Sequence, residues 1–126
     1  MARILGIDLG TTNSLIAYMD GKTPRVIAGK QGRAMVPSVV AMTDNGLIVG
    51  DPAKEHLVRN PARTIYSVKR FMGKSLADVS EELKYFPYKL HEQGGVIRIQ
   101  VGAKTYSPPQ ISAMILKELK LRAEAH

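Results

Sequence analysis

A nine-residue stretch near the N-terminus constrains this chain more than any other feature: Gly6-Ile7-Asp8-Leu9-Gly10-Thr11-Thr12-Asn13-Ser14. Short apolar runs flank its Gly-Thr-Thr-Asn centre, which is typical of two strands joined by a turn. Gly10 allows a backbone to approach an anion closely, and the N–H groups of the turn can donate to it, as can the Thr11 and Thr12 hydroxyls. The stretch therefore predicts a hairpin whose turn binds phosphate.

One carboxylate, Asp8, lies just before this turn. A carboxylate and a phosphate repel each other, and a divalent cation or its water shell between them removes the conflict. We therefore expect a nucleotide with Mg²⁺, and Asp8 as a metal ligand through water. Two plainer interpretations stay open. Asp8 could be a strand-end acid that caps a neighbouring turn, and Thr11, Thr12 and Asn13 could be turn formers only.

Two Gly-Lys-hydroxyl triplets could suggest a different phosphate loop, at Gly21-Lys22-Thr23 and Gly73-Lys74-Ser75. Both fail that pattern, because it requires a glycine five positions earlier, where Ile16 and Val68 stand. The sequence contains no cysteine and its three histidines are scattered, so it predicts no transition-metal site.

The composition allows a globular domain, with 126 residues of which 44% are hydrophobic. The net charge of +7 raises the question of nucleic acid, but the basic residues form no dense run and have no interleaved aromatic residues. The N-terminus lacks a charged-then-apolar signal pattern, and no apolar stretch is long enough to span a bilayer. We therefore expect a cytoplasmic protein that binds neither nucleic acid nor membrane.

The first third of the chain is expected to be rich in strands. Residues 1–36 alternate short apolar strands with turns at Asp20-Gly21 and at residues 29–32, which predicts a three-stranded meander. An extended run over residues 36–42 follows. Helices are then expected to start at Asp51-Pro52 and at Asn60-Pro61, where a capping side chain precedes a proline.

The second of these helices is predicted to cover residues 60–73 and to end at Gly73. Its buried face would carry Ile65, Val68 and Met72. Lys69 and Arg70 would lie on its flank, where a lysine is ordinarily solvated. A third short helix is expected to start at Ser75 and Asp78 and to end near residue 83.

The last third is predicted to form strands at residues 88–90, 96–101 and 104–106, followed by a helix. Ser107-Pro108-Pro109-Gln110 combines an N-cap, a first-turn proline and a capping-box glutamine, so the helix starts there. Its buried stripe would consist of Ile111, Ile115 and Leu119, and Glu118 would pair with Arg122. The pattern reaches no stop signal by His126, so we expect an N-terminal piece of a longer protein.

The order of residues in the hairpin resembles the first phosphate loop of the seventy-kilodalton heat-shock chaperones, and Asn13 resembles the bacterial or organellar, DnaK-type branch. Further landmarks in the family's order are Thr23-Pro24-Arg25-Val26-Ile27, Val36-Pro37-Ser38-Val39-Val40, Val49-Gly50-Asp51-Pro52-Ala53-Lys54, Asn60-Pro61, Val68-Lys69-Arg70-Phe71-Met72-Gly73 and Ser107-Pro108-Pro109-Gln110-Ile111-Ser112. The resemblance covers essentially the whole chain. It implies a mixed α/β fold, the actin-like (ribonuclease H-like) ATPase fold. In that fold, residues 1–36 would begin the nucleotide-clasping subdomain, residues 37–107 an inserted subdomain, and residues 108–126 a helix that returns to the first.

The resemblance also implies roles for individual residues. Lys69 would be the catalytic lysine, which reaches toward the γ-phosphate of ATP, and Asp8 would act on Mg²⁺ through water. The residues that contact ATP or ADP would be Gly10, Thr11, Thr12, Asn13 and Arg70. The implied partners are unfolded polypeptide clients, a J-domain cochaperone and a nucleotide exchange factor.

The remaining catalytic parts lie, in the family, after position 126, so the chain alone is expected not to hydrolyse ATP. Without their family partners, the N-terminal meander and the stripe of the last helix would keep apolar surface uncovered, which predicts a homo-oligomer. Two other classes stay open: an actin-like filament or scaffold protein regulated by nucleotide, and a self-contained interaction module.

Overall fold

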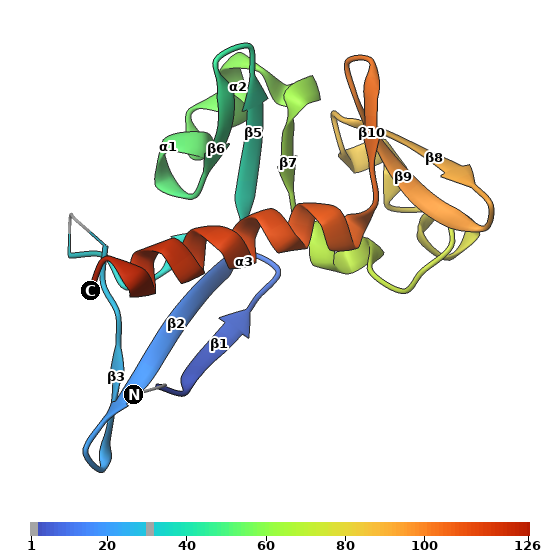
Figure 1. Ribbon diagram of the computed structural model, residues 1–126. Helices are drawn as coiled ribbons and strands as arrows, with labels where there is room; N and C mark the ends of the chain where they lie inside the picture. Colours follow the sequence, from blue (N-terminus) through green and yellow to red (C-terminus); the bar gives the residue numbers. More distant parts are fainter. Residues whose placement is uncertain (1–2, 30–31) are drawn as a thin grey trace.

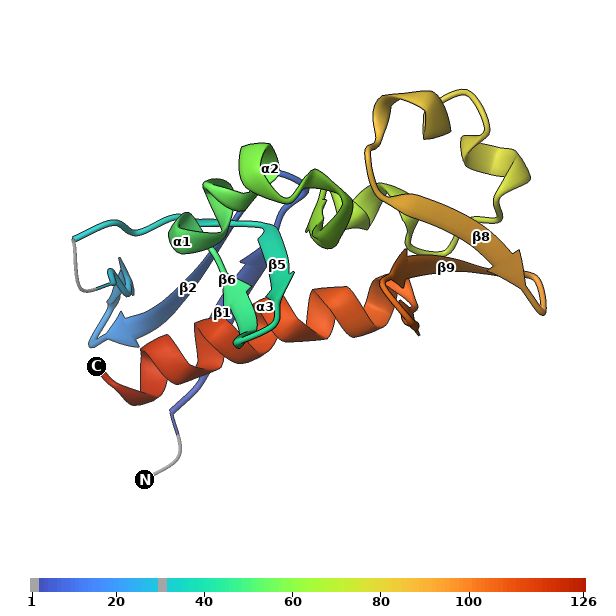
Figure 2. The ribbon, with the colours of Figure 1, turned by 90° about the horizontal axis from the view of Figure 1, so that it is seen from above.

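The computed structural model describes residues 3–29 and 32–126. It consists of three small antiparallel sheets and one long helix, α3 (Pro108–Glu124). The helix runs between the first and the second sheet, and the third sheet lies at its N-terminal end (Figures 1 and 2). In the described residues, no helix is both long and apolar enough to cross a membrane.

The first sheet confirms the predicted meander. β1 (Leu5–Leu9), β2 (Asn13–Asp20) and β3 (Thr23–Val26) pair antiparallel in this order, and β4 (Val36–Pro37) also pairs with β2. Asp20 pairs with Thr23, and Gly21 between them has the positive φ, 65°, that a tight hairpin turn needs. The predicted turn at residues 29–32 includes residues 30 and 31, which lie outside the described residues.

The second sheet has β5 (Val39–Thr43) at its centre, between β6 (Gly46–Val49) and β7 (Thr64–Tyr66). Two short helices, α1 (Asp51–Lys54) and α2 (His56–Arg59), and a 3-10 turn, η1 (Pro61–Arg63), connect β6 to β7. Alternate residues of β5 point to opposite faces, toward α1 on one side and toward α3 on the other, so the strand is buried on both faces. The expected extended run thus divides at Ser38 into β4 and β5.

The predicted helix over residues 60–73 is wrong. Its first part forms η1 and then β7, where Ile65 pairs with Val40 of β5. Its second part is a separate 3-10 turn, η2 (Val68–Phe71). Ile65 and Val68 are buried as expected and Met72 is half-buried, but pairing with β5 satisfies the backbone of residues 64–66 and so overrides the helical pattern.

Two predicted helix caps also act differently. Gly50, with a φ of 88°, precedes α1, and Asp51 lies in the first turn of that helix rather than before it. The side chain of Asn60 contacts His56 Nδ1 at 3.0 Å and makes no capping bond to η1. Both prolines nevertheless occupy the first turn of their element, as the sequence predicts.

The third sheet contains β8 (Lys89–Gln93), β9 (Val96–Val101) and β10 (Lys104–Tyr106), in the order β10-β9-β8. The last two strands are confirmed at their predicted bounds. The first starts one residue later than predicted and extends to Gln93. The alternating residues of β9 are buried as expected, namely Ile97, Ile99 and Val101.

The segment before this sheet forms 3-10 turns, η3 (Ala77–Val79) and η4 (Leu83–Tyr85), instead of the predicted helix over residues 75–83. Ser75 and Asp78, which were expected to start that helix, do bond to each other, although no α-helix follows. The Ser75 N–H donates to the Asp78 carboxylate at 2.9 Å, and the Asp78 N–H donates to Ser75 Oγ at 3.4 Å. The backbone hydrogen bond from Ser75, and then its hydroxyl, lower the pKa of Asp78 below its ordinary value.

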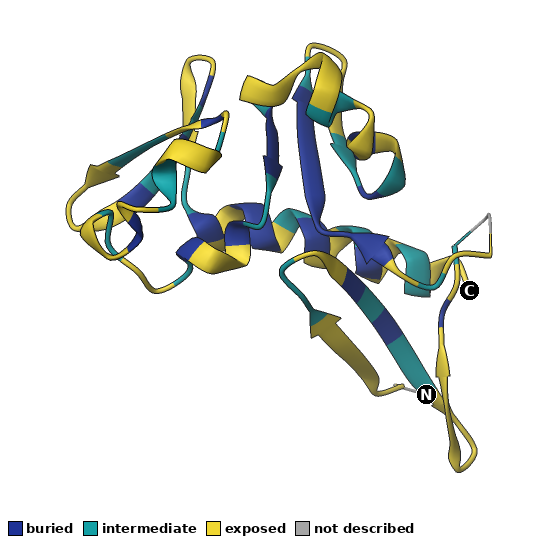
Figure 3. Cartoon of the chain, turned by 180° about the vertical axis from the view of Figure 1, so that it is seen from behind, coloured by how far each residue is buried: buried dark blue, intermediate teal, exposed yellow. Residues whose placement is uncertain are grey.

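Helix α3 begins with the predicted capping box, in which Ser107 and Gln110 each bond to the other's backbone N–H. Its stripe of Ile111, Ile115 and Leu119 is fully buried against the first two sheets (Figure 3), so the expectation that this stripe lacks contact surface is wrong. The expected Glu118–Arg122 pair is not formed. Instead Arg122 donates to the Arg33 carbonyl at 3.2 Å.

Candidate functional site

The turn that joins the paired parts of β1 and β2 consists of residues 10–13, because Leu9 pairs with Ser14 in register. Its last residue, Asn13, also begins β2 and pairs with Pro37 of β4. A β-carbon added to Gly10 would overlap the carbonyl oxygen of Asn13 across the turn. Any other residue would therefore force the turn open. The predicted hairpin is confirmed, and this close approach explains its glycine.

Two buried hydroxyls hold the turn from its inner side. Ser38 Oγ donates to the Gly10 carbonyl at 2.9 Å and lies 2.8 Å from Ser14 Oγ, and the Gly10 N–H donates to Ser14 Oγ at 3.3 Å. The Ser38 N–H also donates to the Thr12 carbonyl at 2.8 Å. No motif in the sequence predicts a role for Ser38. Its only signal was its place in the landmark Val36-Pro37-Ser38, because Ser38 reaches the turn through tertiary structure alone.

The outer side of the turn offers hydrogen-bond donors. The backbone N–H groups of Thr11 and Thr12 have no acceptor within residues 3–29 and 32–126. Thr12 and Asn13 are exposed, and Thr11 is half-buried. The Gly10 N–H, by contrast, is already bonded to Ser14. Adjacent N–H groups and hydroxyls on one turn bind oxyanions, so this arrangement fits the oxygens of a phosphate.

Asp8 lies on β1, two residues before Gly10, and is exposed. It pairs with Leu15, whereas the neighbouring Ile16 packs in the core with α3. Because alternate strand residues point to opposite faces, Asp8 lies on the face of the first sheet away from α3. The described residues contain no cluster of three or more His, Cys, Asp or Glu side chains that could hold a metal. Asp8 offers one carboxylate, which suits Mg²⁺ that is bound mainly through phosphate and water.

Lys69 and Arg70 lie in η2, and both side chains are exposed. In a 3-10 helix, residues three apart lie on the same side, and here Val68 and Phe71 are both buried. The two cationic side chains therefore point outward from a segment whose other side is fixed in the core.

Aromatic packing and helix α3 anchor this segment. The Phe71 ring meets the Phe86 ring edge-on, with 5.1 Å between centroids, and meets Tyr88 in the same way at 6.4 Å. Ser112 Oγ of α3 donates to Met72 Sδ at 3.1 Å. η2 is thus held from two sides, by the aromatic residues of the segment before β8 and by α3.

Ser67 joins β7 to η2 in a left-handed backbone conformation, with a φ of 55°. No other non-glycine residue of the described chain has a positive φ. This conformation costs about 1–2 kcal/mol for a residue with a side chain. Such strain persists only where the surrounding packing fixes it, and it often lies at functional sites.

Tyr88 connects this segment to the second sheet, because its hydroxyl donates to the Tyr66 carbonyl at 2.6 Å. Burial raises the pKa of Tyr88 far above its ordinary value, the neighbouring Tyr66 acts in the same direction, and the positive charge of Arg70 acts in the opposite direction.

The tip of the β1–β2 hairpin lies next to η2 in both views of the chain (Figures 1 and 2). The phosphate-binding candidates at residues 10–13 and the cationic segment with Lys69 and Arg70 thus belong to neighbouring parts of the fold. They are 56 or more positions apart in the sequence, from Asn13 to Lys69.

A comparison with protein families gives a match over residues 4–126 to the family described as Hsp70 protein. The chain belongs to the Hsp70 family. Proteins of this family are ATP-binding heat-shock chaperones with an actin-like ATPase fold, and the mixed sheets and helices of this chain agree with that fold. The match favours the chaperone family over the two other classes that the sequence left open.

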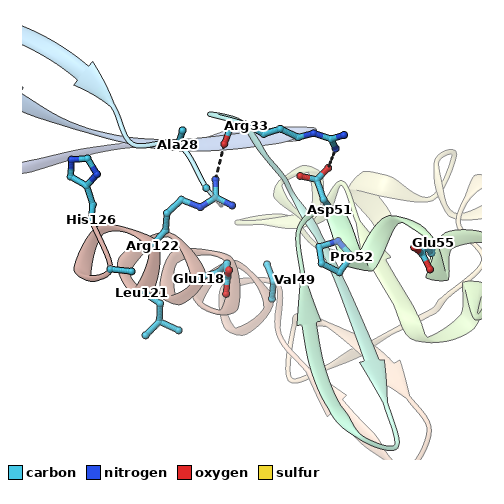
Figure 4. Close-up of a pocket in the computed structure, with 12 residues that line it drawn as sticks. Ala28, Arg33, Val49, Asp51, Pro52, Glu55, Glu118, Leu121, Arg122 and His126 are labelled. Atoms are coloured by element: carbon cyan, nitrogen blue, oxygen red, sulfur yellow. Dashed lines mark hydrogen bonds and ion pairs between the residues drawn. The ribbon is translucent and has the colours of Figure 1, made fainter. Parts of the chain in front are cut away.

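A hollow with a volume of about 980 Å³ lies at the C-terminal end of α3 in this Hsp70 chain, away from η2 (Figure 4). Arg33 pairs with Asp51 at 3.0 Å on its wall, and Arg122 of α3 donates to the Arg33 carbonyl. None of the residues of the phosphate turn lines this hollow, and neither does Lys69. Arg33 thus contacts α1 through Asp51 and α3 through Arg122, so we assign these charges a structural role.

Proposed function

We propose that this chain supplies the phosphate-binding turn and the lysine of an Hsp70 nucleotide site, which takes ATP or ADP with Mg²⁺. The observation that carries the proposal is the turn at residues 10–13: its inner side is fixed by serine hydroxyls, and its outer side has unpaired N–H donors. Gly10, Thr11, Thr12 and Asn13 would hold phosphate oxygens. Asp8 would orient the water shell of Mg²⁺, and the ion offsets the negative charge of the phosphates.

Lys69 is proposed as the catalytic residue and Arg70 as a phosphate-binding one. The Lys69 ammonium makes no ion pair within the described chain, so its charge is not offset by a protein carboxylate. A compact positive charge beside the transferring phosphoryl group stabilises its charge in the transition state, which is the main protein contribution to phosphoryl transfer.

In the whole protein we propose the family's cycle, in which ATP hydrolysis drives binding and release of unfolded polypeptides in the cytoplasm. A J-domain cochaperone and a nucleotide exchange factor would act on this cycle. Residues 1–36, 37–107 and 108–126 would be the first part of the nucleotide-clasping subdomain, the inserted subdomain and the returning helix. The chain alone would bind nucleotide weakly and not hydrolyse it, because Asp8, Thr12 and Asn13 are exposed to solvent, which weakens electrostatic contacts.

We also propose that this chain self-associates through its first sheet. Ile4, just before the edge strand β1, is 90% exposed, and Leu5 and Ile7 on β1 are 41% and 46% exposed. β1 has one strand neighbour, β2, among the described residues, so its other edge offers unpaired backbone groups. Light scattering at increasing protein concentration tests this proposal, and a strict monomer contradicts it.

Titration with Mg-ATP, followed by the amide NMR signals of the chain, tests the nucleotide site. We expect the Thr11, Thr12 and Asn13 signals to shift with a dissociation constant on the order of 1 mM or weaker. Thr12→Ala should raise the dissociation constant obtained from these shifts, whereas Thr105→Ala, at an exposed threonine of β10, should leave it unchanged. Shifts spread over all basic residues, or none at the turn, would contradict the proposal.

Lys69 is tested in an Hsp70 ATPase domain that carries this sequence. We expect Lys69→Ala to abolish hydrolysis and to leave nucleotide binding largely intact, because its charge acts on the transition state. Lys104→Ala, at an exposed lysine of β10, is the matched control. A single-turnover rate equal to that of the unchanged protein would remove Lys69 from the catalytic role.

A further inference from the structure

The hydrogen bonds around the phosphate turn form a closed ring with a single possible direction. Ser38 has one hydroxyl proton and donates it to the Gly10 carbonyl at 2.9 Å. Ser14 must therefore be the donor in its 2.8 Å contact with Ser38 Oγ. Ser14 Oγ in turn accepts from the Gly10 N–H, at 3.3 Å. The ring starts and ends on Gly10, and both hydroxyls have all the partners they need in the interior.

This ring fixes the direction of the donors on the outer side of the turn. The C=O and N–H of one trans peptide point in opposite directions, and the described chain has no cis peptide. The Gly10 carbonyl is held inward by Ser38 Oγ, so the Thr11 N–H of the same peptide points outward. The Thr12 carbonyl is held by the Ser38 N–H, so the Asn13 N–H points away from Ser38 as well.

Ser38 also occupies a special place in the chain. It is the one residue between β4, which pairs with β2 of the first sheet, and β5, the central strand of the second. It is 2% exposed, so its hydroxyl has no competing water. The turn is therefore attached, through one buried side chain, to the point where the chain passes between sheets.

The same strand leads to the lysine segment. Val39, directly after Ser38, pairs with Tyr66 of β7, and Tyr66 is followed by the strained Ser67 and then by η2 with Lys69. The phosphate turn is thus connected to the cationic segment through the pairing of β5 with β7 and the bend at Ser67. The two halves of the candidate site are therefore aligned by β5, and Ser38 is the contact that carries this alignment to the turn.

We propose that Ser38 is the positioning residue of the phosphate turn: it sets the direction of the Thr11 and Asn13 N–H groups toward phosphate and aligns the turn with the segment of Lys69. The part of this proposal that concerns phosphate rests on the nucleotide site proposed above. Ser38 itself does not contact the phosphate. It acts through the carbonyls of Gly10 and Thr12, and Ser14 completes its hydrogen bonding.

Amide hydrogen exchange of the nucleotide-free chain is the first test. Ser38→Ala leaves the Gly10 carbonyl without a donor and the Ser14 hydroxyl proton without an acceptor. Ser14 is then free to turn away from the Gly10 N–H, so we expect the protection of the Gly10 amide to fall by about tenfold. Ser14→Ala should have the same effect, and the double variant should lose little more than either single one, because each breaks the same ring. Thr43→Ala, which removes a hydroxyl at the other end of β5, is the control and should leave Gly10 protected. Unchanged protection in Ser38→Ala, or additive losses, would overturn the proposal.

Mg-ATP titration of the same variants is the second test. The quantity measured is the dissociation constant of Mg-ATP, obtained from the shift of the Thr11 amide signal. We expect Ser38→Ala to raise this constant by about tenfold, and Ser38→Thr, which keeps the hydroxyl, to restore it. A purely structural role would instead lower thermal stability and leave the Thr11 shift unchanged in the folded fraction, which would overturn the proposal. If the unchanged chain shows no shift at the turn, the nucleotide site fails, while the exchange data still decide whether Ser38 orders the turn.

Discussion

The two halves of the candidate site are built in opposite ways. The phosphate turn is local: its glycine, hydroxyls and flanking strands are consecutive in the sequence, and their hairpin pairs with itself. The lysine segment is a short 3-10 turn that depends on β5, the aromatic segment before β8 and α3 for its position. The difference shows that one site can combine a motif that can be recognised in the sequence, the phosphate turn, with a residue, Lys69, whose position depends on contacts with distant segments.

The largest effect that tests this comparison is expected at the anchor of the lysine segment. Phe71 is 1% exposed, so Phe71→Ala should lower the free energy of unfolding by about 3–5 kcal/mol, as the aromatic contacts with Phe86 and Tyr88 are lost. Urea unfolding measures this change. Tyr85→Ala, at an aromatic residue that is 71% exposed, should change it by less than about 0.5 kcal/mol. Equal effects of the two variants would show that η2 is not fixed by the core.

An intermediate effect is expected at the glycine of the turn. Gly10→Ala places a β-carbon against the Asn13 carbonyl, which should cost about 1–3 kcal/mol in unfolding free energy and shift the amide signals of residues 10–13. Gly6→Ala on the same strand is the matched control, because a β-carbon there meets no atom within 4 Å. If both substitutions are tolerated equally, the turn does not require its tight closure.

The smallest effect is expected at the bend before the lysine, and its sign is opposite. Ser67→Gly removes the cost of a left-handed residue with a side chain, which outweighs the added flexibility of glycine, so the chain should gain about 0.5–1 kcal/mol. Thermal unfolding measures the gain. Ser67→Ala, which keeps a β-carbon in that conformation, should give none. A loss of stability in Ser67→Gly would mean that the Ser67 side chain itself holds the bend.

Elements whose signals lie within a few residues could be predicted. The meander, the strands at residues 96–101 and 104–106, and the capped start of α3 agree with the sequence analysis. The helix over residues 60–73 was wrong because its apolar spacing also fits a strand followed by a 3-10 turn. Only pairing with β5, some 25 residues earlier in the chain, decides between the two.

The sequence by itself determined the chemistry of this protein: the residues of the phosphate turn, the family to which the chain belongs and the apolar stripe of α3. Tertiary structure alone decided how these parts are held. It placed the Ser38 hydroxyl inside the turn, the left-handed bend at Ser67 and the Phe71 anchor beneath Lys69. The physical reason is that turn chemistry and capping act between neighbours in the sequence, whereas burial and strand pairing are decided by whichever distant segment satisfies the backbone and covers the apolar side chains.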